Sequence, residues 1–323
     1  MAVTSKPDVI EVDVEHALPY RYPMGPYPTG WYLLAESKDV QPGDVLPIRY
    51  FGQELVLFRT EAGEPIVLDA YCPHLGAHLG HGGTVEGEAI RCPFHSWRFD
   101  KTGQVDDIPY KSSPGLPDVA ARCWHVDEVS GLVLVWFSEH GHAPTWRMPE
   151  QEHWDEAGWL GYYERRWNVR VHVQDVAENI PDTTHFVSVH HLPEYPEAKA
   201  RTEGHIYHQV MGDDSYALRH AAYGLGLTWL TVEMPLRYKF LVAATPVDEQ
   251  YVDLRLLFLI HAPGETELPK QGHSILRTIE KNTSLDVGIW THKAYHERPP
   301  LVAGDGPIGV MRKWAKQFYE DER

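Results

Sequence analysis

The N-terminal half of the chain is a succession of short apolar segments broken by turn-forming residues. Between Trp31 and Phe137 these segments include "WYLLA", "ELVLFRT", "IVLDAY" and "GLVLVWF", and stretches such as "EAGEP" separate them. Apolar runs of this length, bounded by turn formers, are typical of short β-strands. The pattern therefore predicts a small all-β domain.

The C-terminal half contains longer elements. A polar, proline-bearing segment at residues 140–151 suits a linker. Beyond it the pattern predicts a helix around residues 173–190 and two long antiparallel strands within 238–247 and 251–262. The final stretch is amphipathic, with Pro307 near its start, and predicts a C-terminal helix. The second domain is therefore expected to belong to the α+β class.

The composition excludes several kinds of protein. With 323 residues, 43% of them hydrophobic, the chain can form two domains with buried cores. Its formal charge of −17 would repel a phosphate backbone, so nucleic acid is not expected as a partner. The longest apolar runs are much shorter than the roughly 20 residues that span a bilayer. Since the N-terminus also lacks the basic flank and apolar core of a signal peptide, a cytoplasmic protein with no membrane span is expected.

Two of the three cysteines lie in similar short segments. The spacing is C-x-H and then, after seventeen residues, C-x-x-H. The four side chains are Cys72, His74, Cys92 and His95. A tetrahedral zinc ion is one possible occupant. One cysteine and one histidine in each loop instead favour a two-iron cluster, in which both thiolates bind one iron and both imidazoles bind the other.

Neighbouring residues of the same types are expected to have ordinary roles. His78 and His81 lie between the two segments and are interpreted as solvated loop histidines. Cys123 is far from any partner cysteine and is expected to be a buried thiol. Four ligands are therefore predicted for this site.

A second group of chemically active residues lies in "ENIPDTTHFVSVH", residues 178–190. It offers an amide, a carboxylate and two imidazoles, from Asn179, Asp182, His185 and His190. Asp182 and His185 would share one face of a helix, whereas the two histidines would lie about 140° apart on a regular helix. They can reach one metal only where the helix is distorted or ends, and Pro181 favours such irregular backbone. Taken alone, two histidines at this spacing are more often incidental.

The segments together resemble a known family. "CPHLGAHL" and "CPFHSWRFDKTGQ" are similar to the two loops of a Rieske [2Fe-2S] domain, and N-x-x-D-x-x-H-x4-H is similar to the catalytic signature of Rieske non-heme iron oxygenases. Ala77 and Phe94 stand where the Rieske proteins of respiratory and photosynthetic complexes have disulfide-forming cysteines, which indicates the oxygenase or ferredoxin type. The segment from Asp286 to Tyr319 resembles the steroid-acting members, such as 3-ketosteroid 9-alpha-hydroxylase and cholesterol 7-desaturase.

The resemblance implies an α+β architecture in three parts. Residues 1–27 would be an N-terminal arm, and residues 28–144 an all-β Rieske [2Fe-2S] domain. Residues 145–323 would be a catalytic domain with an antiparallel sheet flanked by helices, of the helix-grip type.

The resemblance also implies two metal sites. The [2Fe-2S] ligands would be the four residues of the two Cys/His segments. The mononuclear Fe(II) would be held by His185, His190 and Asp286, a set that leaves open positions for water and O2. From spacing alone, Asp286 is more often a carboxylate on a helix surface. Asp305 is expected to be a turn residue.

A homotrimer is a further implication. In it, His95 of one chain would approach Asp182 of the next, and Asp182 would contact the iron ligand His185. Asp182 and Asn179 would then be catalytic residues beside the iron rather than ligands to it.

The implied activity is that of a Rieske-type monooxygenase or dioxygenase, which hydroxylates or desaturates an apolar substrate, with a steroid or sterol favoured. No strand is followed by G-x-G-x-x-G opening a helix, so electrons would come from a separate NAD(P)H-dependent reductase, a ferredoxin, or both. The alternatives are an oxygenase that hydroxylates or demethylates an aromatic substrate, a non-catalytic Rieske electron carrier, and a zinc-stabilised binding protein. Residue spacing does not decide between these substrates.

Overall fold

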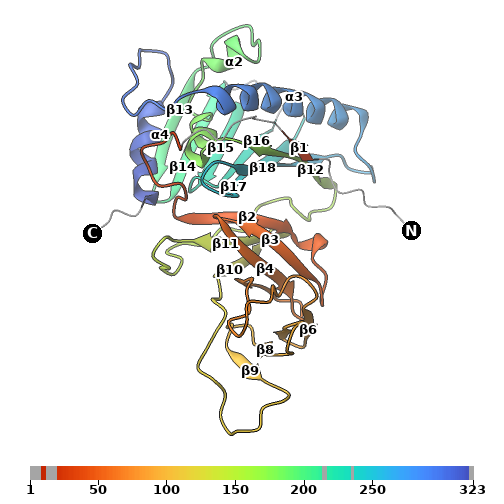
Figure 1. Cartoon of the computed structure of the whole chain (residues 1–323). Helices are drawn as coiled ribbons and strands as arrows, with labels where there is room; N and C mark the ends of the chain where they lie inside the picture. The colour runs from red at the N-terminus through yellow and green to blue at the C-terminus, as the bar shows by residue number, and fades with distance from the viewer. Residues whose placement is uncertain (1–8, 12–19, 213–216, 234–235, 320–323) are drawn as a thin grey trace. The chain divides into compact units, whose positions relative to one another are not determined.

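The computed structural model describes residues 9–11, 20–212, 217–233 and 236–319 (Figure 1). Contacts within the chain divide it into two units. The smaller unit comprises residues 33–137 and 141–150, and the larger comprises residues 1–32, 138–140 and 151–323. The domain boundaries expected after residues 27 and 144 stay a prediction.

The smaller unit is built from three small sheets. The first contains β3 (Val45–Tyr50), β4 (Gln53–Arg59) and β5 (Pro65–Asp69). The second contains β10 (Val126–Val129), β11 (Leu132–Phe137) and β2 (Gly30–Glu36), of which residues 33–36 belong to this unit, and a 3-10 helix (Ser37–Asp39) follows β2. The third contains β6 (Thr84–Glu86), β7 (Ala89–Arg91), β8 (Arg98–Phe99) and β9 (Val105–Asp107). The all-β prediction for this part of the chain is confirmed.

The core of the smaller unit reaches the two Cys/His segments. Val56, Phe58 and Leu68 belong to one cluster of buried side chains, and Cys72 and Cys92 belong to the same cluster. The thiols are therefore anchored in packed β structure and not on exposed loop tips.

The larger unit contains one eight-stranded sheet. The order of its strands is β1-β12-β18-β17-β16-β15-β14-β13. Neighbouring strands are antiparallel except for β1 and β12, which are parallel. The strands are β1 (Val9–Glu11), β12 (Trp159–Val169), β13 (Ala198–Glu203), β14 (Ile206–Gly212), β15 (Ala217–Tyr223), β16 (Leu227–Val232), β17 (Tyr238–Pro246) and β18 (Val252–His261). The two long strands expected from the alternation are β17 and β18, so that prediction is confirmed.

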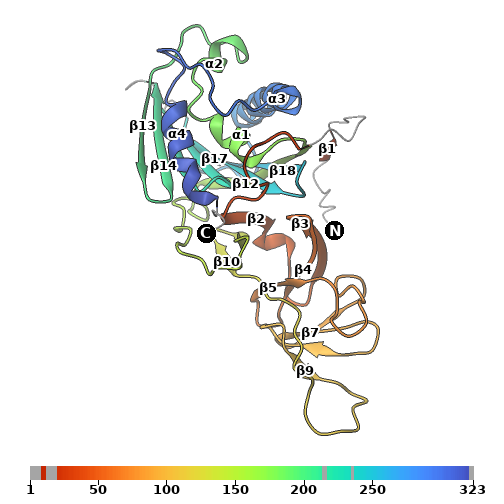
Figure 2. The ribbon, with the colours of Figure 1, turned by 60° about the vertical axis from the view of Figure 1, so that its left-hand side comes forward.

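The helices of the larger unit lie mainly on one side of this sheet. They are α1 (Val173–Glu178), α2 (His185–Ser188), α3 (Lys270–His292) and α4 (Ile308–Ala315), with a 3-10 helix (Lys316–Phe318) after α4. Figures 1 and 2 show α3 crossing one face of the sheet. The expected C-terminal helix is α4, which begins directly after Pro307, and its last expected residues lie outside the described part of the chain. Within the described residues, none of the helices combines the length and the apolar character needed to cross a bilayer.

The single helix expected over residues 173–190 is wrong. α1 ends at Glu178, and α2 begins only at His185. Pro181 lacks a backbone N–H and disfavours helical geometry at the residue before it, so the helix cannot continue through this point. Asp182 therefore precedes α2 and does not share a helical face with His185.

The guanidinium of Arg21 fixes the C-terminal end of α3. It donates to the carbonyl oxygens of Trp290 (2.8 Å), Thr291 (3.0 Å) and Lys293 (2.6 Å), and also to that of Arg170 (2.9 Å). The last carbonyl groups of a helix have no partners within the helix. Arg21 satisfies those of Trp290 and Thr291 and ties this end of α3 to the chain after β12.

Candidate metal centres and cavity

The two Cys/His segments fold in the same way. The N–H of Cys72 donates to Ala77 O (2.9 Å), and that of Cys92 donates to Trp97 O (2.8 Å). The fourth residue after each cysteine donates back to the carbonyl of that cysteine, at 2.9 Å for Gly76 and 3.1 Å for Ser96. Both of these residues have left-handed backbone, with φ of 75° and 58°. The two loops therefore present their side chains in matching geometry.

The side chains of these loops fit a [2Fe-2S] cluster. Cys72 and Cys92 are each only 3% exposed. Burial, together with the neighbouring thiol of Cys92, raises the pKa of Cys72 to about 11. Two adjacent buried thiols become thiolates readily only beside a cation. The rings of His74 and His95 lie 4.9 Å apart between centroids and are partly exposed, so the two thiols form one close pair and the two imidazoles another, as the two irons of such a cluster require.

Trp97 packs against this donor set. Its ring stacks on that of His74 with a centroid distance of 4.3 Å, and its indole N–H donates to the hydroxyl of Tyr110 (2.7 Å). Packing against Trp97 fixes the orientation of the His74 ring, and histidines that bind a metal are usually held in a fixed orientation by their neighbours. Trp97 therefore shields one histidine and holds it in place.

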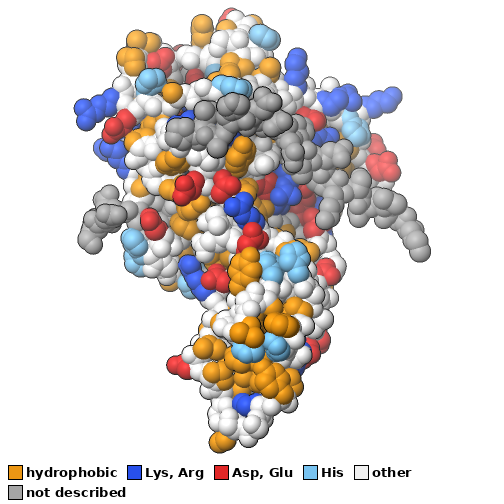
Figure 3. Space-filling model, in the orientation of Figure 1, with side chains coloured by type: hydrophobic (Ala, Val, Ile, Leu, Met, Phe, Trp, Pro, Cys, Tyr) orange, Lys and Arg blue, Asp and Glu red, His pale blue; other side chains and the backbone are white. Residues whose placement is uncertain are grey.

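Large apolar side chains are exposed around the two loops. Figure 3 shows hydrophobic and histidine side chains gathered on the face of this unit that is turned to the viewer. The exposed residues near the loops are Tyr71, Leu75, Phe94 and Tyr110, each more than half exposed. Exposed apolar patches of this kind often mark contacts with other proteins.

His78, His81 and Cys123 have partners of their own outside the two Cys/His pairs. His78 accepts from the N–H of Gly80 at Nδ1 (3.0 Å), and its ring is 4.5 Å from that of His81. Burial, and then the neighbouring His81, lower the pKa of His78. Cys123 is exposed and directs its thiol at Lys101 O (3.3 Å), so the expectation of a buried thiol is wrong. It lies in an isolated antiparallel β-bridge with Leu68, with its side chain at the surface.

The second candidate centre combines residues from two distant segments. The rings of His185 and His190 lie 4.9 Å apart and are steeply inclined, at 81°. Asp286, from α3, has its Oδ1 at 3.2 Å from His190 Nε2 and 4.0 Å from His185 Nε2. One ligand atom from each of these residues lies within 4.8 Å of the others. α2 ends at Ser188, between the two histidines, which is how residues on different faces of a regular helix come together here.

The burial of these three side chains fits a metal ion. His185 is 9% exposed and Asp286 is 7% exposed, and the side chain of His190 is 3% exposed. Within the described residues, both ring nitrogens of His185 and the Nδ1 of His190 have no hydrogen-bond partner. Buried polar atoms are seldom left unpaired. Two imidazoles and one carboxylate with open positions around them are the donor set of non-heme Fe(II) oxygenases.

Two further residues hold these side chains. The side-chain amide of Asn179 donates to Asp286 Oδ2 (3.3 Å), which leaves Oδ1 facing the histidines. Asp182 Oδ1 accepts from the Thr184 hydroxyl (3.0 Å) and from the backbone N–H of His185 (3.3 Å), and it lies 3.7 Å from His185 Nδ1. Burial raises the pKa of Asp182, but the contacts with His185 and Thr184 outweigh it and keep that pKa below its usual value. An ionised Asp182 can therefore orient His185.

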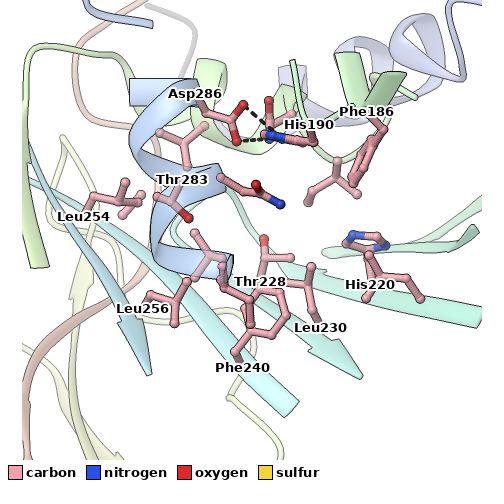
Figure 4. A pocket seen from close by; sticks show the side chains of 18 of the residues that line it. Phe186, His190, His220, Thr228, Leu230, Phe240, Leu254, Leu256, Thr283 and Asp286 are labelled. Carbon is pink, nitrogen blue, oxygen red and sulfur yellow. Dashed lines mark hydrogen bonds and ion pairs between the residues drawn. The ribbon is translucent and has the colours of Figure 1, made fainter. Parts of the chain in front are cut away.

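A cavity of about 430 Å³ opens beside Asp286 and His190. Its floor is formed by strands of the eight-stranded sheet and its roof by α1, α3 and Phe186 (Figure 4). Most of the side chains that line it are apolar, among them Leu218, Leu230, Phe240, Leu254, Leu256 and Ile279. Cavities of this size and character bind small apolar molecules with a few polar contacts. The sequence alone does not show which residues of "YGLGLTWLTVEM" and "LRLLFLI" face it.

The fold and the two donor sets define a class of protein. One unit carries paired Cys/His loops on a β scaffold, and the other carries a two-histidine, one-carboxylate set at the wall of an apolar cavity. This combination is that of the Rieske non-heme iron oxygenases.

Comparison with known families agrees with this class. Residues 30–126 match the Rieske [2Fe-2S] domain, and residues 135–319 match the 3-ketosteroid 9alpha-hydroxylase C-terminal domain. The chain belongs to the Rieske oxygenases whose C-terminal domain is of the 3-ketosteroid 9alpha-hydroxylase family. It is thus an oxidoreductase that uses a Rieske [2Fe-2S] cluster, mononuclear non-heme iron and O2.

Curated relatives extend over nearly the whole chain. A 3-ketosteroid-9-alpha-monooxygenase, oxygenase component, from Mycolicibacterium smegmatis is 31% identical over 336 residues, covering 94% of this chain and 84% of the relative. A cholesterol 7-desaturase from Bombyx mori is 30% identical over 325 residues, covering 92% of this chain and 70% of the relative. Both steroid-acting groups named by the sequence resemblance are therefore among the relatives.

Solved structures support the fold. A Pseudomonas putida CBB5 NdmA mutant with caffeine superposes with a TM-score of 0.75 at 16% identity, covering 89% of each chain. Dicamba monooxygenase bound to dicamba superposes with a TM-score of 0.70 at 16% identity, covering 89% of this chain and 96% of the other. At this level of identity the likeness concerns the fold alone.

Proposed function

We propose that this chain is a terminal oxygenase component that receives electrons at its Rieske cluster and uses O2 at a mononuclear Fe(II) to hydroxylate or desaturate a steroid or sterol. The observation that carries the proposal is the meeting of His185, His190 and Asp286 at the wall of a cavity of about 430 Å³ lined mainly by apolar side chains. The 3-ketosteroid monooxygenase and cholesterol desaturase relatives support the choice of substrate.

We assign the cluster to Cys72, His74, Cys92 and His95 and the mononuclear iron to His185, His190 and Asp286. When bound, the cluster supplies single electrons and the iron supplies a site that activates O2. Asn179 keeps one oxygen of Asp286 directed at the histidines through its hydrogen bond to the other. The apolar walls of the cavity keep water away from the reacting carbon and hold the substrate by burial of its surface.

In a homotrimer, Asp182 is proposed to connect the mononuclear iron site of its own chain with the [2Fe-2S] cluster of a neighbouring chain. Its side chain is 36% exposed, whereas that of its neighbour His185 is 10% exposed. A group from a second chain can therefore reach Asp182 from solvent, and His95 of that chain is our candidate. The exposed apolar residues around the cluster loops support contacts of this unit with other proteins, including a reductase or ferredoxin.

The proposal is tested by counting metals and then identifying a product. The wild-type protein should contain about three irons per chain, two in the cluster and one at the second site. The Asp286→Ala variant should keep the cluster and its EPR signal and lose about one iron per chain. With NADH and a surrogate reductase, the wild type should convert at least one member of a steroid and sterol panel, and the variant none.

Two results would overturn the proposal. A wild-type protein with an intact cluster but only about two irons per chain would be an electron carrier. Conversion of aromatic acids, together with no binding or conversion of any steroid, would assign the chain to the other substrate class.

A further inference from the structure

The side of α3 that lines the cavity changes character along the helix. Ile275 and Ile279 line the cavity towards the start of the helix, and Asn282 and Thr283 line it close to Asp286. At a rise of about 1.5 Å per residue, Asp286 lies about 5 Å along the helix axis from the polar pair and about 16 Å from Ile275. The helix therefore offers a polar surface near the candidate iron site and an apolar surface away from it.

The polar atoms of Asn282 and Thr283 are accessible to a ligand. Both side chains are partly exposed. Within the described residues, the amide and the hydroxyl make no hydrogen bond, and neither is enclosed by protein atoms. Figure 4 shows Thr283 on α3, next to Asp286 and facing the cavity. An amide and a hydroxyl can each donate and accept, so the pair suits an oxygen atom of a bound molecule.

The hydroxyl of Thr283 differs from other hydroxyls of the same helix. Serine and threonine inside a helix commonly donate to the carbonyl group four residues earlier. Three residues of α3 do so, at distances of 3.0, 2.8 and 2.8 Å: Thr278 to Ser274, Ser284 to Glu280, and Thr291 to Val287. Thr283 makes no such bond among the residues that the structure describes, so its hydroxyl keeps its full hydrogen-bonding capacity for the cavity.

The floor of the cavity offers a further accessible hydroxyl. Thr228 on β16 is opposite Val242, which is opposite Leu256, so the three side chains share the face of the sheet that lines the cavity. In the described part of the chain, the Thr228 hydroxyl has no partner and is not enclosed. His220 also lines the floor, but its unpaired nitrogen is enclosed by protein atoms and cannot meet a ligand. Thr228 is therefore the floor residue to compare with the pair on α3.

We propose that Asn282 and Thr283 bind the oxygen atom of a steroid ketone or alcohol, which directs the oxygenated end of the substrate to the iron site and its hydrocarbon end towards Ile275. The inference rests on the proposed function and adds to it the orientation of the substrate. Because both side chains donate and accept, a ketone and the matching alcohol can each bond to them. A hydrocarbon would displace water from these groups without replacing its hydrogen bonds.

The test follows each compound across a set of variants, which removes differences in solubility between compounds. The dissociation constants of 5α-androstan-3-one, 5α-androstan-17-one and 5α-androstane are measured by equilibrium dialysis of tritiated compounds against the metal-loaded protein. Asn282→Leu and Thr283→Val remove the polar groups at nearly constant size. Each should weaken the binding of at least one ketone by about 10-fold and leave the affinity for androstane unchanged or higher.

Two further variants serve as controls. Thr278→Val removes a hydroxyl that lies on the same helix and lines the same cavity, but that already donates to Ser274 O. It should bind all three compounds as the wild type does. Thr283→Ser retains the hydroxyl, and it should keep most of the affinity for the ketone even if Thr283→Val folds poorly.

The orientation has a readout of its own. Paramagnetic relaxation by the ferrous iron is measured for the tighter-binding ketone, carrying a ¹³C label either at the carbonyl carbon or at the opposite end of the steroid. In the wild type the carbonyl label should relax faster than the distant label. In Thr283→Val the difference between the two labels should become smaller, because the oxygen is no longer held beside the iron site.

Each remaining outcome counts against the inference in its own way. Unchanged ketone affinity in both Asn282→Leu and Thr283→Val, or equal losses for ketone and androstane, would overturn the role of the pair and leave the proposed function standing. A loss seen only in Thr228→Val would place the oxygen at the floor instead. Faster relaxation of the distant label would overturn the orientation. Failure of all three compounds to bind the wild type would overturn the steroid substrate and this inference with it.

Discussion

The two candidate metal sites are built in opposite ways. The cluster loops are short and nearly identical in backbone, and their ligands come from neighbouring turns of one β scaffold. The second site takes His185 from the start of α2, His190 from the chain just after that helix ends, and a third ligand from α3, far along the chain. The first geometry is local, whereas the second depends on how distant elements pack. Disturbing residues that contact no metal should therefore affect the second site more than the first.

The largest effect is expected when one ligand of each site is removed. Cys92→Ser should lose the cluster and keep the mononuclear iron, whereas His190→Ala should lose the mononuclear iron and keep the cluster, because each donor set closes within its own unit. Both variants should fall to background turnover. Metal analysis and the EPR spectrum of the reduced cluster report the two sites separately. Loss of both metals from either variant would show that the sites are not independent.

Asp182→Ala should leave both metals in place and lower turnover by about 10- to 100-fold or more, because the residue lies beside His185 and, in the proposed trimer, would link the chains without binding iron itself. Iron content and steady-state product formation check this. The matched control is Thr184→Val, which removes only one bond to the Asp182 carboxylate and should have a much smaller effect. Normal turnover in Asp182→Ala would remove Asp182 from the mechanism.

Asn179→Ala should lower the affinity for the mononuclear iron by about 10-fold, because Asp286 loses the hydrogen-bond donor that holds its second oxygen. Competition with a chelator measures this affinity. The EPR signal of the cluster should stay unchanged. An iron affinity equal to that of the wild type would mean that the position of Asp286 is set by α3 alone.

A smaller effect, on stability, compares two arginines that donate to backbone near the two sites. Arg21→Ala should cost about 3 kcal/mol, because four carbonyl oxygens at the end of α3 and after β12 lose their donor. Arg91 donates to a single carbonyl of the cluster loops, that of Ser96, and its other partners are half-exposed carboxylates. Arg91→Ala should therefore cost about 1 kcal/mol. Urea unfolding of each variant gives both numbers, and an equal cost would contradict the comparison.

The features that the sequence predicts best are those set by residues close together in the chain. The alternation along residues 238–247 and 251–262 predicts β17 and β18 because a period of two is present within each strand. The shared Cys/His spacing likewise predicts that the two loops form one site. The helix expected over residues 173–190 fails at Pro181, although that residue already favours a break.

Long-range packing limits the rest of the prediction. Asp286 can be chosen among the downstream acids only by resemblance, because its approach to His190 depends on where α3 crosses the sheet. His220 and Thr228 are unremarkable in the sequence, and they share one cavity because the register of β15 and β16 places them on the same face. Strand register between distant segments is set by packing rather than by any short motif.

The most direct test of the account is a crystal of the metal-loaded protein, with anomalous scattering measured at the iron edge. The account predicts one isolated peak among His185, His190 and Asp286, beside the apolar cavity, and a separate pair of irons among the two Cys/His loops. Density for the pair alone, with the first three side chains bonded only to protein or water, would contradict it.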